Sequence, residues 1–328
     1  MFAAQDLGFP LLPPSSEFLD HDFKQGANFA VVAATTLGFD FFNERGLSKG
    51  LWVNASVYIQ VERFEKLLPT ICGAPQELFE LVVDCKDFLS KSLFIVGEFG
   101  GNDYSTALFF GRRIDEVSTF VPPVVNAISD GVERLIGLGA VDIVVPGLLP
   151  VGCFPLYLTN YHTADPEDYG PKTGCGRKYN ALSWLHNAML RKALDHLRRK
   201  YPSVSIRYAD YYSQIIDFAL NPLKYGQSLS SFRSHTVSVM HGLPITDSST
   251  FSSNTLRTCC GNGGGVYNYD QGRRCNDKGY TVCENVSTHV SWDGIHMTEA
   301  AHRVIATGWL HGPYVDPPIL SSSSSSQS

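Results

Sequence analysis

The stretch AVDIVVPGLLPVGCFPLYL, residues 140–158, guides how the rest of the chain is interpreted. It is the most apolar window of the sequence, but Asp142 and three prolines exclude a continuous membrane-spanning helix. The valines and isoleucine between Val141 and Pro146 are typical of a strand buried on both faces, which is the habit of parallel sheets. We therefore expect a buried strand at 141–146, followed by a loop.

Similar apolar runs recur along the chain, with helical periodicities between them. Strands are expected at 27–33, 93–97, 141–146 and 204–208. Helices are expected at 57–68, 76–90, 115–137, 178–200, 211–220 and 298–309. This alternation predicts one α/β domain over residues 1–318, with right-handed crossovers and ligands bound outside the carboxyl ends of the strands.

Two stretches depart from this alternation. Residues 228–254 are Ser-rich and lack periodicity, so we interpret them as an insertion. Residues 319–328 are of low complexity, and we expect them to form a disordered tail.

Charge and cysteine usage restrict the function classes. With a net charge of −6 and no long basic run, the chain is not expected to bind nucleic acid, and we expect no transmembrane segment. The cysteine spacings do not match a zinc site, and two glycosylation sequons begin at Asn54 and Asn285, so disulfides in an oxidising compartment are favoured. The residues after Met1 do not resemble a secretory signal. The disulfide candidates are Cys72, Cys85, Cys153, Cys175, Cys259, Cys260, Cys275 and Cys283.

Asp293 and His296, in the segment SWDGIHMTEAAHR at 291–303, are the first pair with catalytic chemistry. A carboxylate bonded to imidazole Nδ1 holds the tautomer whose Nε2 can take a proton from a hydroxyl. The same residues also fit a cap on the helix that follows, so the motif alone leaves both interpretations open.

Two further stretches can supply donors to a developing oxyanion. VGEFGGNDY, residues 96–104, follows an expected strand and can present the Asn102 amide, although it also fits an ordinary turn. GANFAVVAAT, residues 26–35, is a strand that ends in small residues, which allow a backbone N–H to approach a ligand, or it is simply a core strand.

Taken in this order, the three stretches resemble the plant GDSL-type esterase/lipase family, the Ser-Gly-Asn-His (SGNH) hydrolases. ADYY at 209–212, TCCGNGGGVYN at 258–268 and WDGIHMTEAAHR at 292–303 extend the resemblance over nearly the whole chain. Within the family the chain is most similar to the sinapine esterase-like and acetylajmalan esterase-like branch. The resemblance implies a three-layer α/β/α flavodoxin-like parallel sheet.

The resemblance also implies roles for individual residues. His296 would be the general base and Asp293 its orienting acid, while Asn102 would donate its amide to the oxyanion beside Gly100 and Gly101. Ala33 stands where the family usually has a glycine whose backbone N–H is the second oxyanion donor. If that position needs a positive φ, alanine is strained there.

The family's nucleophile lies in a G-D-S-L block, and this sequence contains neither that block nor a G-x-S-x-G elbow. The resemblance thus implies that the first, central strand is missing together with the nucleophile. We expect a truncated or mis-spliced product that folds poorly, or that pairs its second and third family strands directly to cover the unpaired edges.

The function expected is hydrolysis of a carboxylic ester by serine acyl transfer. The alternative is a catalytically inactive product, at most a binding module. A metal-dependent phosphoesterase is disfavoured because the ten histidines are scattered. We expect no cofactor, no metal, a small-molecule ester as the partner, a monomer, and secretion.

Disulfide pairing is only partly predictable. Cys72 and Cys85 bracket a short helical hairpin and are expected to pair, as are Cys153 and Cys175 in loops after the fourth family strand. Three connectivities remain open for the other four cysteines.

Overall fold

The computed structural model describes residues 2–15, 23–72, 85–225 and 250–320. By its internal contacts the chain divides into two compact units. Unit 1 comprises Met1–Leu149, Leu182–Asp210 and Leu310–Ser328, and unit 2 comprises Pro150–Ala181 and Tyr211–Trp309. Most of the expected 228–254 insertion and residues 321–328 of the expected tail lie outside the described residues.

A small parallel sheet forms the centre of unit 1. It consists of β1 (Leu93–Ile95), β2 (Asp142–Pro146) and β3 (Ser205–Ala209) in the order β1-β2-β3. Both pairings are parallel, with Phe94 opposite Ile143 and Val144 opposite Arg207. Residues 143–145 of β2 are fully buried, so this part of the molecule is α/β and is consistent with an SGNH-hydrolase fold.

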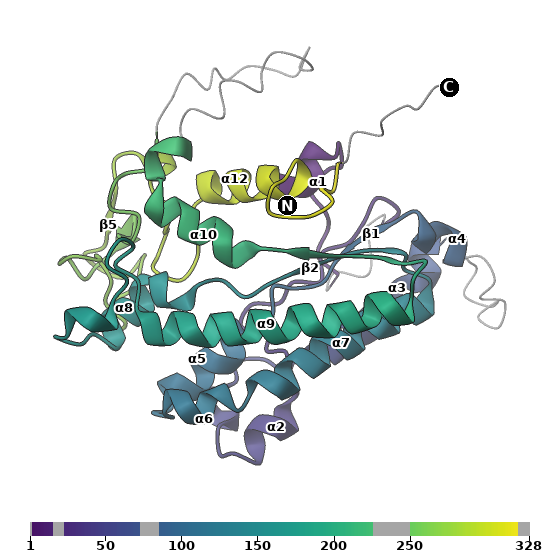
Figure 1. Cartoon of the computed structure of the whole chain (residues 1–328), viewed down its shortest axis with the longest axis horizontal. Coiled ribbons are helices and arrows are strands. Elements are labelled where there is room, and N and C mark those ends of the chain that lie inside the picture. Colours follow the sequence, from purple (N-terminus) through teal and green to yellow (C-terminus); the bar gives the residue numbers. More distant parts are fainter. Residues whose placement is uncertain (1, 16–22, 73–84, 226–249, 321–328) are drawn as a thin grey trace, which may run out of the picture. The chain divides into compact units, whose positions relative to one another are not determined.

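The helices of unit 1 follow the expected ranges in part. They are α1 (Phe2–Asp6), α2 (Phe39–Asn43), η1 (Ser48–Gly50), α3 (Val57–Cys72), α4 (Cys85–Ser90), α5 (Gly101–Phe109), α6 (Ile114–Ser118) and α7 (Val121–Leu138). The long helix α9 (Arg177–Lys200) begins in unit 2 and continues through unit 1. In Figure 1, α7 and α9 run beneath the three strands.

Helices α3 and α7 pack closely because α7 has a glycine, without a side chain, at their contact. A Cβ at Gly131 of α7 would lie 3.0 Å from Cγ2 of Val57. Further along the same pair, Arg134 donates two hydrogen bonds to the Glu65 carboxylate, at 2.6 and 2.5 Å. The pairing therefore combines apolar contact with a bidentate ion pair at the surface.

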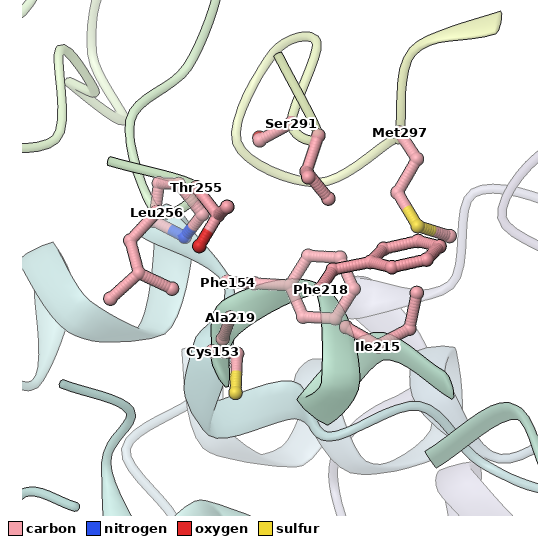
Figure 2. A pocket seen from close by; sticks show the side chains of 11 residues that line it. Cys153, Phe154, Ile215, Phe218, Ala219, Thr255, Leu256, Ser291 and Met297 are labelled. Carbon is pink, nitrogen blue, oxygen red and sulfur yellow. The ribbon is translucent and has the colours of Figure 1, made fainter. Parts of the chain in front are cut away.

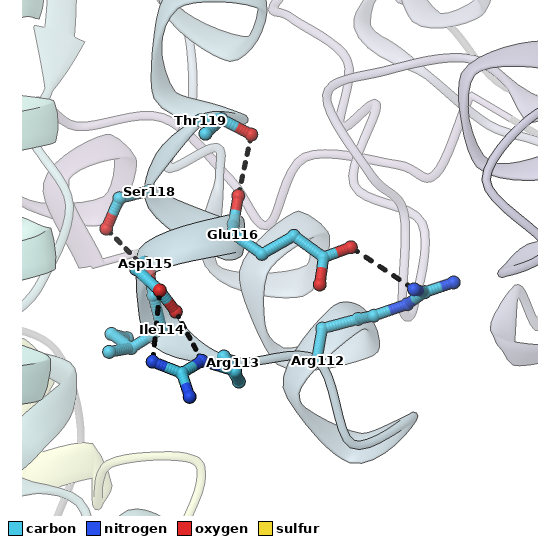
Figure 3. A network of polar contacts seen from close by, with 7 residues as sticks. All are labelled: Arg112, Arg113, Ile114, Asp115, Glu116, Ser118 and Thr119. Carbon is cyan, nitrogen blue, oxygen red and sulfur yellow. Dashed lines mark hydrogen bonds and ion pairs between the residues drawn. The ribbon is translucent and has the colours of Figure 1, made fainter.

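The single helix expected at 115–137 is wrong, because the structure has two. Pro122 and Pro123 lie in the first turn of α7, where their missing N–H groups are not needed, and a helix interior would not tolerate them. Helix α6 has its own polar network, in which Arg113 binds Asp115 and Arg112 pairs with Glu116 (Figure 3).

The strand expected at 27–33 is also wrong. Residue Asn28 makes one isolated parallel bridge to Pro14, and Val32 is 73% exposed. Within the described part of the chain β1 pairs only with β2, and Ile95 is 44% exposed. The direct pairing of 27–33 with 93–97 is therefore wrong as well, since a segment becomes a strand only when a partner satisfies its N–H and C=O groups.

Unit 2 consists of short elements with few regular hydrogen bonds between strands. They are η3 (Val151–Cys153), α8 (Pro155–Asn160), η4 (Pro166–Asp168), α10 (Tyr211–Leu220), η5 (Pro222–Tyr225), β4 (Cys260–Gly261), β5 (Thr281–Val282), η7 (Val286–Thr288) and α12 (Glu299–Leu310), whose last residue belongs to unit 1. Helices α10 and α12 are joined by Tyr211 and Trp309, whose rings meet edge to face at 5.3 Å. Gln214 adds a hydrogen bond of 3.1 Å to the Val304 carbonyl.

Four disulfides link the described residues. Cys72 pairs with Cys85 and Cys153 with Cys175, which are the two pairs expected from the sequence. Cys259 pairs with Cys283 and Cys260 with Cys275, a choice that the sequence left open. Such disulfides are typical of proteins that fold in an oxidising compartment. Among the described residues, no helix has both the length and the apolar character required to cross a membrane.

Candidate active site

The turn that contains Asp293 and His296 is fixed to the disulfide-bonded segment of unit 2. The backbone N–H of Cys259 donates to the Ser291 carbonyl at 3.0 Å, and that of Cys260 donates to the Trp292 carbonyl at 2.7 Å. Both cysteines are themselves tied by disulfides. The turn is closed by a hydrogen bond of 2.8 Å from the Trp292 N–H to the His296 carbonyl. The backbone of the turn is therefore held both by hydrogen bonds to the cysteines and by a hydrogen bond within the turn itself.

Gly294 occupies a position in this turn that only glycine fits. Its φ is +92°, and a Cβ would lie 2.4 Å from Cδ2 of Tyr269. The Gly294 N–H donates to Oγ of Ser291 at 3.1 Å, and its carbonyl accepts from the Leu156 N–H at 3.2 Å. The buried Ser291 hydroxyl thus stabilises the turn, and helix α8 packs directly against it.

Asp293 and His296 form a hydrogen-bonded pair. Oδ2 of Asp293 lies 2.7 Å from Nδ1 of His296. Oδ1 accepts from the backbone N–H groups of Ile295 and His296, at 2.9 and 2.7 Å. The His296 side chain is 67% exposed, whereas that of Asp293 is only 23% exposed. The Asp293 carboxylate therefore orients the imidazole, while the rest of the His296 ring remains accessible to solvent.

The electrostatics of the pair fit this orientation. Burial acts to raise the pKa of Asp293, but the hydrogen bonds from the His296 side chain and from two backbone N–H groups outweigh it and leave that pKa below its ordinary value. The hydrogen bond to Asp293 raises the pKa of His296, against the opposing effect of partial burial. Each partner stabilises the charged form of the other, so an imidazolium formed during a reaction is stabilised.

Asn102 lies in unit 1, in the first turn of α5. The turn before it uses Gly100 at a φ of +101°, where a Cβ would lie 3.0 Å from Cε1 of the buried His186. Nδ2 of Asn102 donates to the Ala34 carbonyl at 2.8 Å. The structure therefore brings the Asn102 amide against the loop that contains Ala33.

Ala33 has a φ of +59°, in the left-handed region that glycine favours. This is the backbone strain expected if the position where the family usually has a glycine requires a positive φ. An alanine in this conformation costs about 1–2 kcal/mol relative to a right-handed one. The loop that carries the Ala33 N–H is therefore less stable than it would be with glycine at position 33.

Asp103 is a residue that the sequence patterns did not single out. Its fully buried carboxylate accepts from the backbone N–H groups of Thr36 and Leu37, at 2.8 and 2.9 Å. Burial raises the pKa of Asp103 to about 6, against the lowering effect of these hydrogen bonds. Asp103 fixes the loop after Ala33 to α5. The only sequence signal for it is its place beside Asn102.

His186 shows what a structural histidine looks like in this protein. It is fully buried, its Nδ1 lies 2.7 Å from the Tyr104 hydroxyl, and burial lowers its pKa to about 3. Its lowered pKa makes it a weak base and its burial closes it to a substrate, so it lacks the basicity and the access that general-base catalysis needs.

A small apolar cavity lies beside the Asp293–His296 turn in unit 2 (Figure 2). Its volume is about 20 Å³, room for roughly one water molecule. Phe154 of the segment before α8, Phe218 of α10, and Ser291 and Met297 of the turn line it. This cavity is too small for a substrate group in its present form.

A metal site needs several ligand atoms that lie close together. Cys259, Cys283 and His289 lie close together, but the two cysteines share a disulfide and offer no thiolate.

The two sequons differ in their surroundings. Asn54 is exposed, and Oδ1 of Asn285 accepts from the Ser287 N–H at 3.0 Å.

Residues 1–309 match the model of the GDSL-like lipase/acylhydrolase family. A GDSL esterase/lipase of Arabidopsis thaliana is 39% identical over 317 residues, which cover 97% of this chain and 73% of the relative. A second one from that plant is 40% identical over 320 residues, covering 96% and 78%. The sinapine esterase of Brassica napus is 38% identical over 316 residues, covering 96% and 73%.

Proposed function

Since the chain belongs to the GDSL-like lipase/acylhydrolase family, we propose that it carries the acid–base pair and the oxyanion donors of a carboxylic ester hydrolase. The reaction is acyl transfer through a serine, on a three-layer flavodoxin-like α/β/α sheet. The observation that carries the proposal is the hydrogen-bonded pair of Asp293 and the exposed His296.

The pair acts as a proton carrier. With the Nδ1 proton held by Asp293, Nε2 of His296 has a lone pair that accepts the proton of the serine hydroxyl as its oxygen attacks the ester carbonyl. The imidazolium then gives this proton to the departing alcohol oxygen. A water molecule repeats both steps on the acyl-enzyme and releases the carboxylic acid. Asp293 stays ionised throughout, in line with its lowered pKa.

The negative charge that develops on the carbonyl oxygen is assigned to Asn102 and Ala33. An asparagine amide has two N–H donors. One of them binds the Ala34 carbonyl and orients the group, which leaves the second for the oxyanion. The Ala33 backbone N–H is the other donor. One such donor contributes about 3–4 kcal/mol to the transition state in comparable sites.

The nucleophile belongs to a G-D-S-L block, which this sequence does not contain. That observation favours a second candidate function, a binding protein that keeps the ester site without turnover. The other expectations remain proposals: a small-molecule ester as substrate, no cofactor or metal, a monomer, secretion, and glycans at Asn54 and Asn285.

Hydrolysis of p-nitrophenyl acetate tests the proposal. The 328-residue chain is compared with a form extended at its N-terminus by a G-D-S-L segment from a relative, each as the parent, as His296→Ala and as His196→Ala. We expect turnover by the extended form, a loss on the order of a million-fold in His296→Ala, and no change in His196→Ala, whose histidine is exposed on α9.

An extended form whose activity survives His296→Ala would refute the assignment of the base. Turnover by the 328-residue chain that depends on His296 would show that a hydroxyl outside a G-D-S-L block is the nucleophile. If neither form turns over but both bind the ester, the second candidate function holds.

A further inference from the structure

Unit 2 contains a second, larger pocket that the proposed chemistry does not use. It has a volume of about 110 Å³ and lies between η3, α8, η4 and the first turn of α9. Four tyrosines line it, with one acidic and one basic residue: Tyr157, Tyr161, Tyr169, Tyr179, Asp168 and Lys178. We call it the tyrosine pocket.

Three of the rings form a continuous aromatic cluster. The ring centroids of Tyr157 and Tyr179 are 5.3 Å apart, and those of Tyr161 and Tyr179 are 5.1 Å apart. Tyrosine is neutral at physiological pH. Burial raises the pKa of Tyr161 to about 12 and raises that of Tyr179 as well, which moves both phenols further from ionisation. The cluster therefore offers neutral ring faces to a ligand.

A disulfide and several hydrogen bonds link the backbone segments around the tyrosine pocket. Cys153 and Cys175 are joined by a disulfide, and between their neighbours the Gly176 N–H donates to the Gly152 carbonyl at 2.7 Å. A Cβ at Gly152 would lie 2.1 Å from the Gly176 oxygen, so the two segments touch at backbone level. Arg177 donates to the Tyr169 carbonyl at 2.9 Å. A pocket with walls fixed in this way loses little conformational entropy when it binds a ligand.

The mouth of the tyrosine pocket is electrically balanced. Asp168 and Lys178 are both exposed, and Oδ2 of Asp168 accepts from the Thr163 hydroxyl at 2.6 Å. An ion of either sign meets one attractive and one repulsive charge there. A neutral planar ring stacks on the tyrosines and can hydrogen-bond to both groups with its substituents.

We propose that the tyrosine pocket binds a neutral six-membered aromatic ring that carries hydroxyl or carbonyl substituents. A closed apolar cavity of about 150 Å³ holds benzene. A pocket of about 110 Å³ with an exposed mouth therefore takes one such ring, with its substituents at the rim.

The position of α8 links this pocket to the proposed active site. The Leu156 N–H donates to the carbonyl of Gly294, which lies between Asp293 and His296, and the next residue, Tyr157, lines the tyrosine pocket. Resting on the function proposed above, the ring is assigned to the ester substrate, as part of its acyl or alcohol group.

Binding is measured by NMR titration of the 328-residue chain with 4-hydroxyacetophenone, in parallel with tetramethylammonium chloride and methyl glucoside. We expect saturable binding of the aromatic compound alone. Absence of saturable aromatic binding, or tighter binding of the cation or the sugar, would overturn the inference. Because no turnover is involved, the result is independent of the hydrolase proposal: ring binding by the 328-residue chain, together with an extended form that lacks turnover, would refute only that proposal.

Variants localise the binding. Tyr161→Leu and Tyr179→Leu remove ring faces, and each is expected to raise the dissociation constant roughly 2- to 10-fold, while the phenylalanine variants at both positions bind as the parent does. Tyr280→Leu is the matched control, since Tyr280 is exposed and lies outside the pocket. If a leucine variant loses its folded NMR spectrum, the corresponding phenylalanine variant decides: loss of binding there contradicts ring stacking. Parent-like binding by folded leucine variants would place the ligand elsewhere and overturn the inference.

Discussion

The turn that carries Asp293 and His296 and the loop that carries Ala33 differ in what holds them in place. The backbone of the turn is hydrogen-bonded to two disulfide-bonded cysteines. At position 294 the positive φ and the close contact with Tyr269 allow only glycine. The loop is held by side-chain contacts with Asp103 and Asn102, and it places an alanine at a positive φ. The acid–base half is preorganised by backbone hydrogen bonds to a disulfide-bonded segment, whereas the oxyanion half carries strain.

The largest expected effect is that of Gly294→Ala. The added Cβ would meet Cδ2 of Tyr269 at 2.4 Å in a backbone conformation unfavourable to alanine. Strain and overpacking together are expected to lower the free energy of unfolding by about 2–5 kcal/mol, as measured by urea denaturation. Gly264→Ala is the control, because Gly264 has a φ of +59° but no atom within 4 Å of its Cβ position, and it should lose only about 1–2 kcal/mol. Equal losses would show that the turn is not tightly packed.

Removal of the Cys260–Cys275 disulfide by serine substitutions comes next. The bridge closes 15 residues, so its loss is expected to lower the free energy of unfolding by about 3 kcal/mol and to weaken the Asp293–His296 pair. The Cys72–Cys85 bridge closes 13 residues in unit 1, and its removal should cost a similar amount. NMR of the His296 ring distinguishes the two: a response to both removals, or to neither, contradicts the account of how the turn is held.

The smallest effect has the opposite sign. Ala33→Gly relieves the left-handed strain and is expected to raise the free energy of unfolding by about 0.5–1 kcal/mol, after the entropy cost of glycine is included. Ala34→Gly, one residue further on and outside the positive-φ region, should lower it by up to about 1 kcal/mol. Differential scanning calorimetry measures both, and destabilisation by Ala33→Gly would mean that the loop is not strained.

Sequence patterns predict parts of this molecule that depend on local chemistry. Strand β2 follows from an apolar run that needs burial on both faces, and the Asp293–His296 contact is favoured by a spacing that keeps both groups on one turn. Residues 27–33 have equally strong strand character, but the partner strand decides, and among the described residues they make only the isolated bridge of Asn28 to Pro14.

Other features depend on contacts distant in sequence. The bonds of Asp103 to Thr36 and Leu37 span more than 60 residues, and the contact of Tyr269 with Gly294 depends on the fold of the disulfide-bonded segment. The pairing of the last four cysteines likewise needs the fold. The break before Pro122, by contrast, was readable from the prolines themselves.

The measurement that tests the account most directly is an NMR pH titration of the His296 imidazole in the 328-residue chain, with its signals assigned by their loss in His296→Gln. Asp293 favours the imidazolium, so the neutral base should form only as the pH rises through a pKa above the ordinary histidine value of about 6.5. In Asp293→Asn the midpoint should move to lower pH. A midpoint at or below 6.5 in the parent chain, or one that Asp293→Asn leaves unchanged, would contradict the claim that Asp293 and His296 form a preorganised general base.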